Sequence, residues 1–268
     1  MTTQLLIIFL LTVLINTIDT SAYAARLAGV RTGHPALASS LYHVLGLGSR
    51  GANALAGPLL ASLTDVAVLE QNTGSLLNVY RIVVLAASVG TLVAALGIPS
   101  LSRILARGIA AYEYRRSLPK VVVRGASVQG LWRMTTDLMP PRLGAVRESR
   151  RSPFPKRFLI ASILVTAIAA VSNAAAMYAS ALVPEGARTA ASLSPMLAGL
   201  GMMLSIFIVN PVAAFVTDEA LREKRPLKDV TYITIWQVGA QLVGTLVAQL
   251  LLLPAGQVIA IVARWLIA

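Results

Sequence analysis

Residues 1–18 read MTTQLLIIFLLTVLINTI, a run without one formally charged side chain. The hydrocarbon core of a bilayer is crossed by a helix of about 20 mostly apolar residues, so this run predicts a membrane span. Further uncharged runs cover Ile82–Ser102, Phe158–Pro184, Thr189–Thr217 and Val230–Ala263. The chain is therefore expected to cross a membrane several times.

The composition agrees with this interpretation. Hydrophobic residues make up 56% of the 268 residues and charged residues only 13%, about half the charged share of a typical soluble chain. The chain has no cysteine, which excludes disulfides, thiolate metal sites and cysteine nucleophiles. The fold class predicted is an all-α polytopic membrane protein.

Six transmembrane helices are expected, with a short tail after the last. Residues 255–268 follow Pro254, and the sequence leaves open whether they form an interfacial turn or continue the sixth helix. The expected spans are residues 3–25, 36–63, 78–100, 157–183, 190–217 and 230–254.

The basic residues predict the orientation of these spans. The net charge is +12, and most Lys and Arg residues fall in the first, third and fifth loops. Cytoplasmic loops carry the excess of Lys and Arg, so these loops are predicted to be cytoplasmic and both termini to lie outside. Residues 101–156 form the most basic loop, which we expect to contact anionic lipid headgroups. No recognisable nucleic-acid-binding module is present.

The two halves of the chain share sequence motifs. The hexapeptide Val89–Ala94 (VGTLVA) recurs letter for letter as Val243–Ala248, and the Pro58–Asp65 spacing of Pro and Thr-Asp recurs in Pro211–Asp218. With three helices per unit, the second unit enters the membrane inverted, as in many transporters. The sequence thus predicts a first repeat at residues 1–100, the basic loop at 101–156 and a second repeat at 157–268. A duplicated structural protein is the alternative.

Polar and charged residues within the first two spans mark a candidate site. An ionisable group inside a span is unfavourable by about 2.5–3.5 kcal/mol on insertion scales, so it requires partners or water. The polar residues of each span share one helical face. They are Asn16, Asp19, Tyr23 and Arg26 in the first span and His43, Arg50 and Asn53 in the second.

We interpret the arginines as an anion site. An Arg side chain donates two parallel hydrogen bonds to phosphate and remains charged, so Arg26, Arg31 and Arg50 are candidates to hold an anion, with Asp19 as counter-ion. Two alternatives stay open. Asp19 and Arg50 could simply neutralise each other, and Arg26 and Arg31 lie near the cytoplasmic boundary, where snorkelling also explains them. His43 is a candidate proton relay, and the alternative is that it is a hydrogen-bonded packing residue.

The sequence carries no phosphate loop, metal-ligand cluster or catalytic triad. It therefore predicts no cofactor, no metal, no catalytic residue and no enzymatic activity. A loop of this size cannot hold a nucleotide-binding domain, so any transport would be driven by a gradient, the membrane potential or substrate consumption.

Four motifs resemble a known family. Ile18–Tyr23, Arg26–Gly33, Ser49–Asn53 and Pro58–Asp65 are similar to the Amj family of bacterial lipid II flippases, the alternative to the MurJ type. The resemblance implies movement of lipid II, an undecaprenyl-pyrophosphate-linked disaccharide-pentapeptide, from the cytoplasmic to the outer leaflet of the bacterial cell membrane. It also implies a role in peptidoglycan synthesis, cell wall biogenesis and cell shape.

The resemblance also implies which residues bind the substrate. These are Asp19, Arg26, Arg31, Arg50 and Asn53. From the polar helix faces themselves, Asn16, Tyr23 and His43 are expected to support the site. Two other functions stay open from the residues themselves. One is an intramembrane enzyme acting on a prenyl-pyrophosphate lipid, with Asp19 as acid or base, and the other is a scaffold in a cell-envelope complex.

Overall fold

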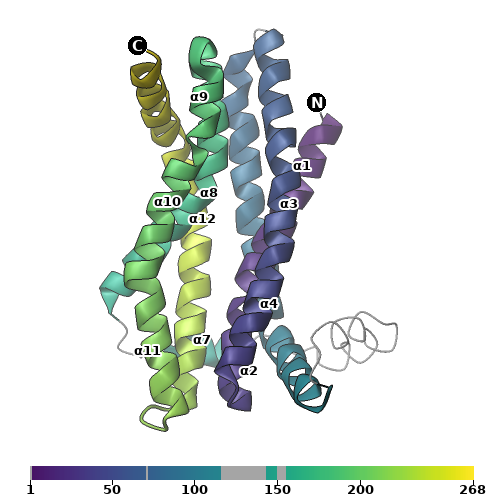
Figure 1. Ribbon diagram of the computed structural model, residues 1–268, viewed down its shortest axis with the longest axis vertical. Coiled ribbons are helices and arrows are strands. Elements are labelled where there is room, and N and C mark those ends of the chain that lie inside the picture. Colours follow the sequence, from purple (N-terminus) through teal and green to yellow (C-terminus); the bar gives the residue numbers. More distant parts are fainter. Residues whose placement is uncertain (1, 71, 116–142, 150–154) are drawn as a thin grey trace.

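The computed structural model describes residues 2–70, 72–115, 143–149 and 155–268 (Figure 1). Within these ranges every regular element is helical and no strand occurs. Six helical segments of the described chain are long and apolar enough to cross a membrane. The predicted all-α fold class with six spans is confirmed.

The first span is interrupted at its polar stretch. Helix α1 (Thr2–Ser21) and helix α2 (Tyr23–Thr32) are separated by Ala22 alone. Gly33 ends α2 in the left-handed conformation, with a φ of 75°, and its N–H bonds the carbonyls at the end of that helix. Left-handed φ is where glycine is favoured over other residues, and Pro35 then starts α3 (Pro35–Leu69).

The third span is longer than expected. A short 3₁₀ turn, η1 (Thr73–Ser75), leads into α4 (Leu76–Arg115), whereas the sequence predicted a helix over residues 78–100. The helix continues through Pro99 with the exposed Arg103 and Arg107 on its surface. Long arginine side chains reach water while their stems lie along apolar surface, so their charges do not end the helix. Residues 101–115 of the predicted loop are thus helical.

A short helix within the predicted basic loop packs against the last helix. Helix α7 (Leu143–Ser149) contacts α12 (Leu227–Ile267). The Tyr232 hydroxyl donates to Glu148 Oε2 at 2.8 Å, and Trp236 Nε1 donates to the Ser149 carbonyl at 3.1 Å. These bonds hold α7 against the bundle. The rest of the predicted basic loop, residues 116–142 and 150–154, lies outside the described residues.

The fifth span is divided into short helices, whereas the fourth and sixth are continuous. The residues before Pro211 form a π-helical turn, and proline has no N–H to donate to the preceding turn, which explains the break there. The elements of this half are α8 (Lys156–Leu182), η2 (Pro184–Gly186), α9 (Ala187–Ser192), α10 (Ser194–Leu204), η3 (Ser205–Val209), α11 (Asn210–Leu221) and α12.

The tail after Pro254 continues the sixth helix. Helix α12 runs unbroken to Ile267, which decides the question that the sequence left open. Transmembrane helices tolerate an internal proline because neighbouring groups satisfy the freed carbonyl.

The chain ends lie at one end of the bundle, and α2, α7 and the α11–α12 turn lie toward the other (Figure 1). This agrees with an even number of crossings. Which end faces the cytoplasm stays a prediction from the basic residues.

Glycines of the repeated hexapeptide bring helices into close contact. Gly90 of α4 lies against the backbone carbonyl of Val13 in α1, and Gly244 of α12 lies against Ile163 and Thr166 of α8. Small residues permit such close approach between membrane helices. The two α4 and α12 helices meet each other through the buried hydrogen bond from Ser88 Oγ to Thr245 Oγ1, at 2.9 Å.

Candidate functional site

A polar cavity surrounds Arg50. Its volume is about 290 Å³, and we call it the Arg50 cavity. Helices α1, α2 and α3 supply nearly all of its wall, and α12 adds one residue. The lining is Asp19, Ala22, Tyr23, Tyr42, His43, Gly46, Ser49, Arg50, Asn53 and Gln241.

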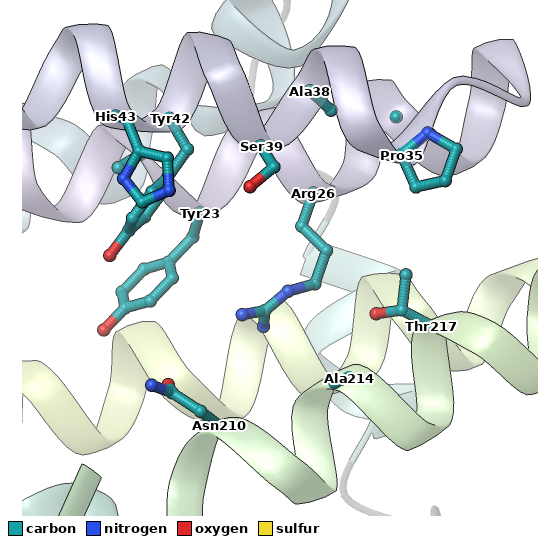
Figure 2. Close-up of a pocket in the computed structure, with 12 residues that line it drawn as sticks. Tyr23, Arg26, Pro35, Ala38, Ser39, Tyr42, His43, Asn210, Ala214 and Thr217 are labelled. Atoms are coloured by element: carbon teal, nitrogen blue, oxygen red, sulfur yellow. The ribbon is translucent and has the colours of Figure 1, made fainter. Parts of the chain in front are cut away.

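A second cavity, the Arg26 cavity, lies directly beside the first and measures about 300 Å³. The Arg26 guanidinium and the Tyr23 ring project from the first half toward Asn210 and Thr217 of α11 (Figure 2). The two cavities share part of their lining and lie side by side, and we refer to them together as the polar space. The shared residues are Ala22, Tyr23, Tyr42 and His43.

Asp19 and Arg50 face the same space without forming an ion pair. Both residues line the Arg50 cavity, and Asp19 lies within reach of the Ser49 hydroxyl and of the charge of Arg50. Within the described residues, no carboxylate lies close enough to Arg50 for a salt bridge. The guanidinium is therefore available to an anion that enters the cavity.

Arg26 is anchored by a neutral partner. Its Nη1 donates a 2.5 Å hydrogen bond to Oε1 of the buried Gln237 on α12. A glutamine carbonyl orients the guanidinium without cancelling its charge. The Arg26 cavity thus also presents a positive group, held in place across the interface between the halves.

Two predicted residues lie elsewhere. Arg31 donates to Ser102 Oγ of α4 at 2.9 Å, and Asn16 donates to the Thr12 carbonyl while its Cβ packs against Gly90. Neither lines the two cavities. Of the predicted site, the structure brings together Asp19, Tyr23, Arg26, His43, Arg50 and Asn53.

The cavities also contain residues that the sequence did not single out as site residues. Tyr42 lines both cavities, and its ring meets that of the predicted site residue His43 edge to face at 5.5 Å. Gln241 and Asn210 come from the second half. The sequence signal that could have identified them is a polar residue within an otherwise apolar span. Gln237 and Gln241, which lie one turn apart on α12, are examples.

Asn53 connects the first half to the second. Its Oδ1 accepts a 3.3 Å hydrogen bond from Asn173 Nδ2 of α8, and Asn173 Oδ1 accepts a 2.5 Å bond from Ser194 of α10. This chain joins α3, α8 and α10 beside the Arg50 cavity.

Replacing Asn173 with alanine should loosen this connection. Loss of both hydrogen bonds is expected to destabilise the fold by about 1–2 kcal/mol, seen as a lower midpoint of thermal unfolding in detergent. Ser192→Ala is the matched control, because Ser192 bonds only the nearby Thr189 carbonyl on its own helix. An Asn173→Ala protein as stable as this control would contradict the connection.

A surface cavity of about 610 Å³ lies at the end of the bundle that holds the α11–α12 turn. Its walls come from the end of α2 and from that turn. They are formed by Val30, Gly33, Ala220, Leu221, Glu223, Lys224, Arg225, Pro226 and Leu227. Within the described ranges, no group of three or more His, Asp or Glu residues is placed to hold a metal ion.

Comparisons with known proteins identify the family. The family model described as "Alternate to MurJ" matches residues 11–263. The chain belongs to the Amj family. It is 31% identical over 266 residues to the lipid II flippase Amj of Bacillus subtilis (strain 168), with 98% of each chain covered. No solved structure matches this Amj-family chain.

The family match covers the whole site. Every residue that lines the Arg50 and Arg26 cavities lies within residues 11–263, and contributions come from both halves. The predicted family resemblance is confirmed along nearly the entire chain, including the second half, which lies outside the four motifs that carried the resemblance.

Proposed function

We propose that this Amj-family chain moves lipid II from the cytoplasmic to the outer leaflet of the bacterial cell membrane, for peptidoglycan synthesis. Its relative in Bacillus subtilis is named a lipid II flippase and is similar over 98% of both chains. The proposal concerns transport of an intact lipid, and the alternative of a prenyl-pyrophosphate enzyme is tested by a separate analysis of the lipids below.

One observation carries the proposal: two arginines project into a polar space between helices of both halves, and neither is in an ion pair within the described residues. A pyrophosphate headgroup must be neutralised to leave water, and guanidinium groups do this through paired, charge-assisted hydrogen bonds. The polyprenyl tail needs no such site because it stays in the bilayer.

The size of the space indicates that the halves move during transport. Each cavity is about 300 Å³, at the bottom of the range of about 300–1,000 Å³ for small-molecule sites, and a disaccharide-pentapeptide is larger than such ligands. The helices are interrupted at two places beside the cavities. These are Ala22, between α1 and α2, and the π-helical turn η3 before Pro211. We infer that the helices bend at these points to widen the path.

We also propose that the two halves are inverted repeats. Gly90 and Gly244 occupy the same position of the shared hexapeptide, and each packs on the first long helix of its own half. Each glycine touches two residues that lie three positions apart, Val13 and Asn16 or Ile163 and Thr166. This equivalence supports a common ancestor unit and rocking of one half against the other.

The end with the surface cavity is proposed to face the cytoplasm, with both chain termini outside. This end carries exposed basic residues on α4 and in the α11–α12 turn, among them Arg103, Arg107 and Lys224. They would lie near anionic lipid headgroups. The surface cavity would then be the place where the headgroup enters.

The decisive experiment uses cells that lack every other lipid II flippase. A hydrolytic toxin added from outside cleaves only lipid II that has reached the outer leaflet. Expression of this chain is expected to restore cleavage and growth. Uncleaved lipid II in cells that hold normal membrane levels of the protein would contradict the proposal.

Mass spectrometry of the lipids separates transport from catalysis. A flippase leaves the lipid chemically intact in proteoliposomes of purified protein, so we expect relocated lipid II and no new product. Release of phosphate or a changed glycolipid would instead favour the enzyme.

A further inference from the structure

Gln241 has an unused hydrogen-bonding group at the wall of the Arg50 cavity. It is the residue that α12 contributes to this cavity, and its side chain is only 7% exposed. Its Oε1 is buried without a hydrogen-bond partner among the described residues. Buried polar atoms are nearly always paired, so an unpaired amide oxygen on a residue that lines a cavity points to a ligand that completes the bond.

The neighbouring glutamine shows the contrast. Gln237 lies one turn earlier on α12 and is equally buried, but its Oε1 accepts the bond from Arg26. Gln237 therefore serves the protein's own structure, whereas Oε1 of Gln241 has no hydrogen-bond partner among the described residues. Because Oε1 is buried, it reaches the cavity by rotation about the last side-chain bond, which exchanges the amide oxygen and nitrogen at small energetic expense.

The hydrogen-bonding chemistry of an amide determines which part of a lipid headgroup it can bind. An ionised phosphate offers only acceptors, and Arg50 in the same cavity already supplies donors for it. The amide oxygen instead needs a donor. Sugar hydroxyls and the N–H groups of acetamido substituents and peptides are donors, and a bare polyprenyl pyrophosphate carries none.

We propose that Gln241 is a specificity-determining residue that accepts a hydrogen bond from the sugar-peptide part of the headgroup while Arg50 neutralises its phosphate. The cavity then favours a glycan-bearing polyprenyl pyrophosphate over the same lipid without its sugar. A site built to pair with a hydroxyl or N–H discriminates strongly against an analogue that lacks it. This inference rests on the proposed function.

The test compares Gln241→Met with the wild type in detergent, by equilibrium binding of lipid II and of undecaprenyl pyrophosphate. Wild type is expected to prefer lipid II. The variant should bind lipid II about tenfold more weakly and undecaprenyl pyrophosphate unchanged. Its thermal stability should not fall, because methionine has similar length and removes an unpaired buried oxygen. Gln249→Met is the matched control, since Gln249 bonds the Arg81 carbonyl away from both cavities.

Each outcome decides the inference. Equal binding of both lipids by wild type, or an equal loss for both lipids in Gln241→Met, overturns it. An unchanged preference in Gln241→Met overturns it too. Transport is measured separately in proteoliposomes, so a wild type that prefers lipid II through Gln241 but moves no lipid contradicts the proposed function and supports the binding role.

Discussion

Replacing Arg50 with glutamine is expected to abolish rescue of cells that lack other lipid II flippases. Arg50 lines the cavity and is in no ion pair within the described residues. Charge-assisted hydrogen bonds contribute about 1.5–3 kcal/mol each, so the loss of phosphate affinity should be at least about tenfold. Growth on depletion of the resident flippase and the membrane level of the variant are the measurements.

Two matched variants show whether the charge or its geometry matters. Arg50→Lys keeps the charge but loses the planar fork, and we expect partial rescue. Arg188→Gln removes an exposed arginine that lines neither cavity, and we expect full rescue. Full rescue by Arg50→Gln at normal membrane levels would remove Arg50 from the mechanism.

A double variant separates substrate binding from internal neutralisation. If Arg50 served only to compensate Asp19, then Asp19→Asn combined with Arg50→Gln would restore function, because no uncompensated charge remains. If Arg50 binds the headgroup phosphate, the double variant stays inactive. We expect the second result, since the two side chains share a cavity but form no ion pair in the described structure.

The fold was predictable where hydropathy alone decides it. Uncharged runs located five of the six spans, and the second is a largely apolar stretch that contains Arg50. Such runs are informative because lipid demands continuous helices. Their ends were not predictable in the same way: the arginines between Arg103 and Arg115 suggested a loop, and Pro254 suggested a stop. In the structure both α4 and α12 continue past these signals. The arginines of α4 extend their charges to water, and helices that neighbour α12 satisfy the carbonyl that Pro254 leaves without its bond.

The site was predictable only on the side that the first two spans supply. Asp19, Tyr23 and Arg26 share a helical face and do line the cavities. Asn16 shares that face too, but α4 covers it at Gly90, and helix periodicity does not reveal which neighbour covers which turn. The partners from α11 and α12, such as Asn210 and Gln241, are brought in by tertiary packing across the halves.

Substitution of Gly90 by valine is expected to prevent stable folding. Any Cβ at this position would overlap the Val13 carbonyl oxygen of α1, and a backbone atom within a helix cannot move aside. Overpacking in a tight core destabilises by about 1–3 kcal/mol or more, a large share of a total of about 5–15 kcal/mol. The measurements are membrane abundance and the thermal midpoint in detergent.

Gly244→Val should fail in the same way if the halves are equivalent, because its Cβ would lie 2.7 Å from the Ile163 carbonyl oxygen and 2.7 Å from Thr166 Cβ. The controls are Gly97→Ala in α4 and Gly239→Ala in α12, where a Cβ meets nothing within 4 Å. They should be neutral or stabilising, since alanine favours a helix over glycine by about 1 kcal/mol. If the Gly244→Val protein folds stably while the Gly90→Val protein does not, the repeated hexapeptide packs differently in the two halves. Rocking of equivalent units would then lose its structural support.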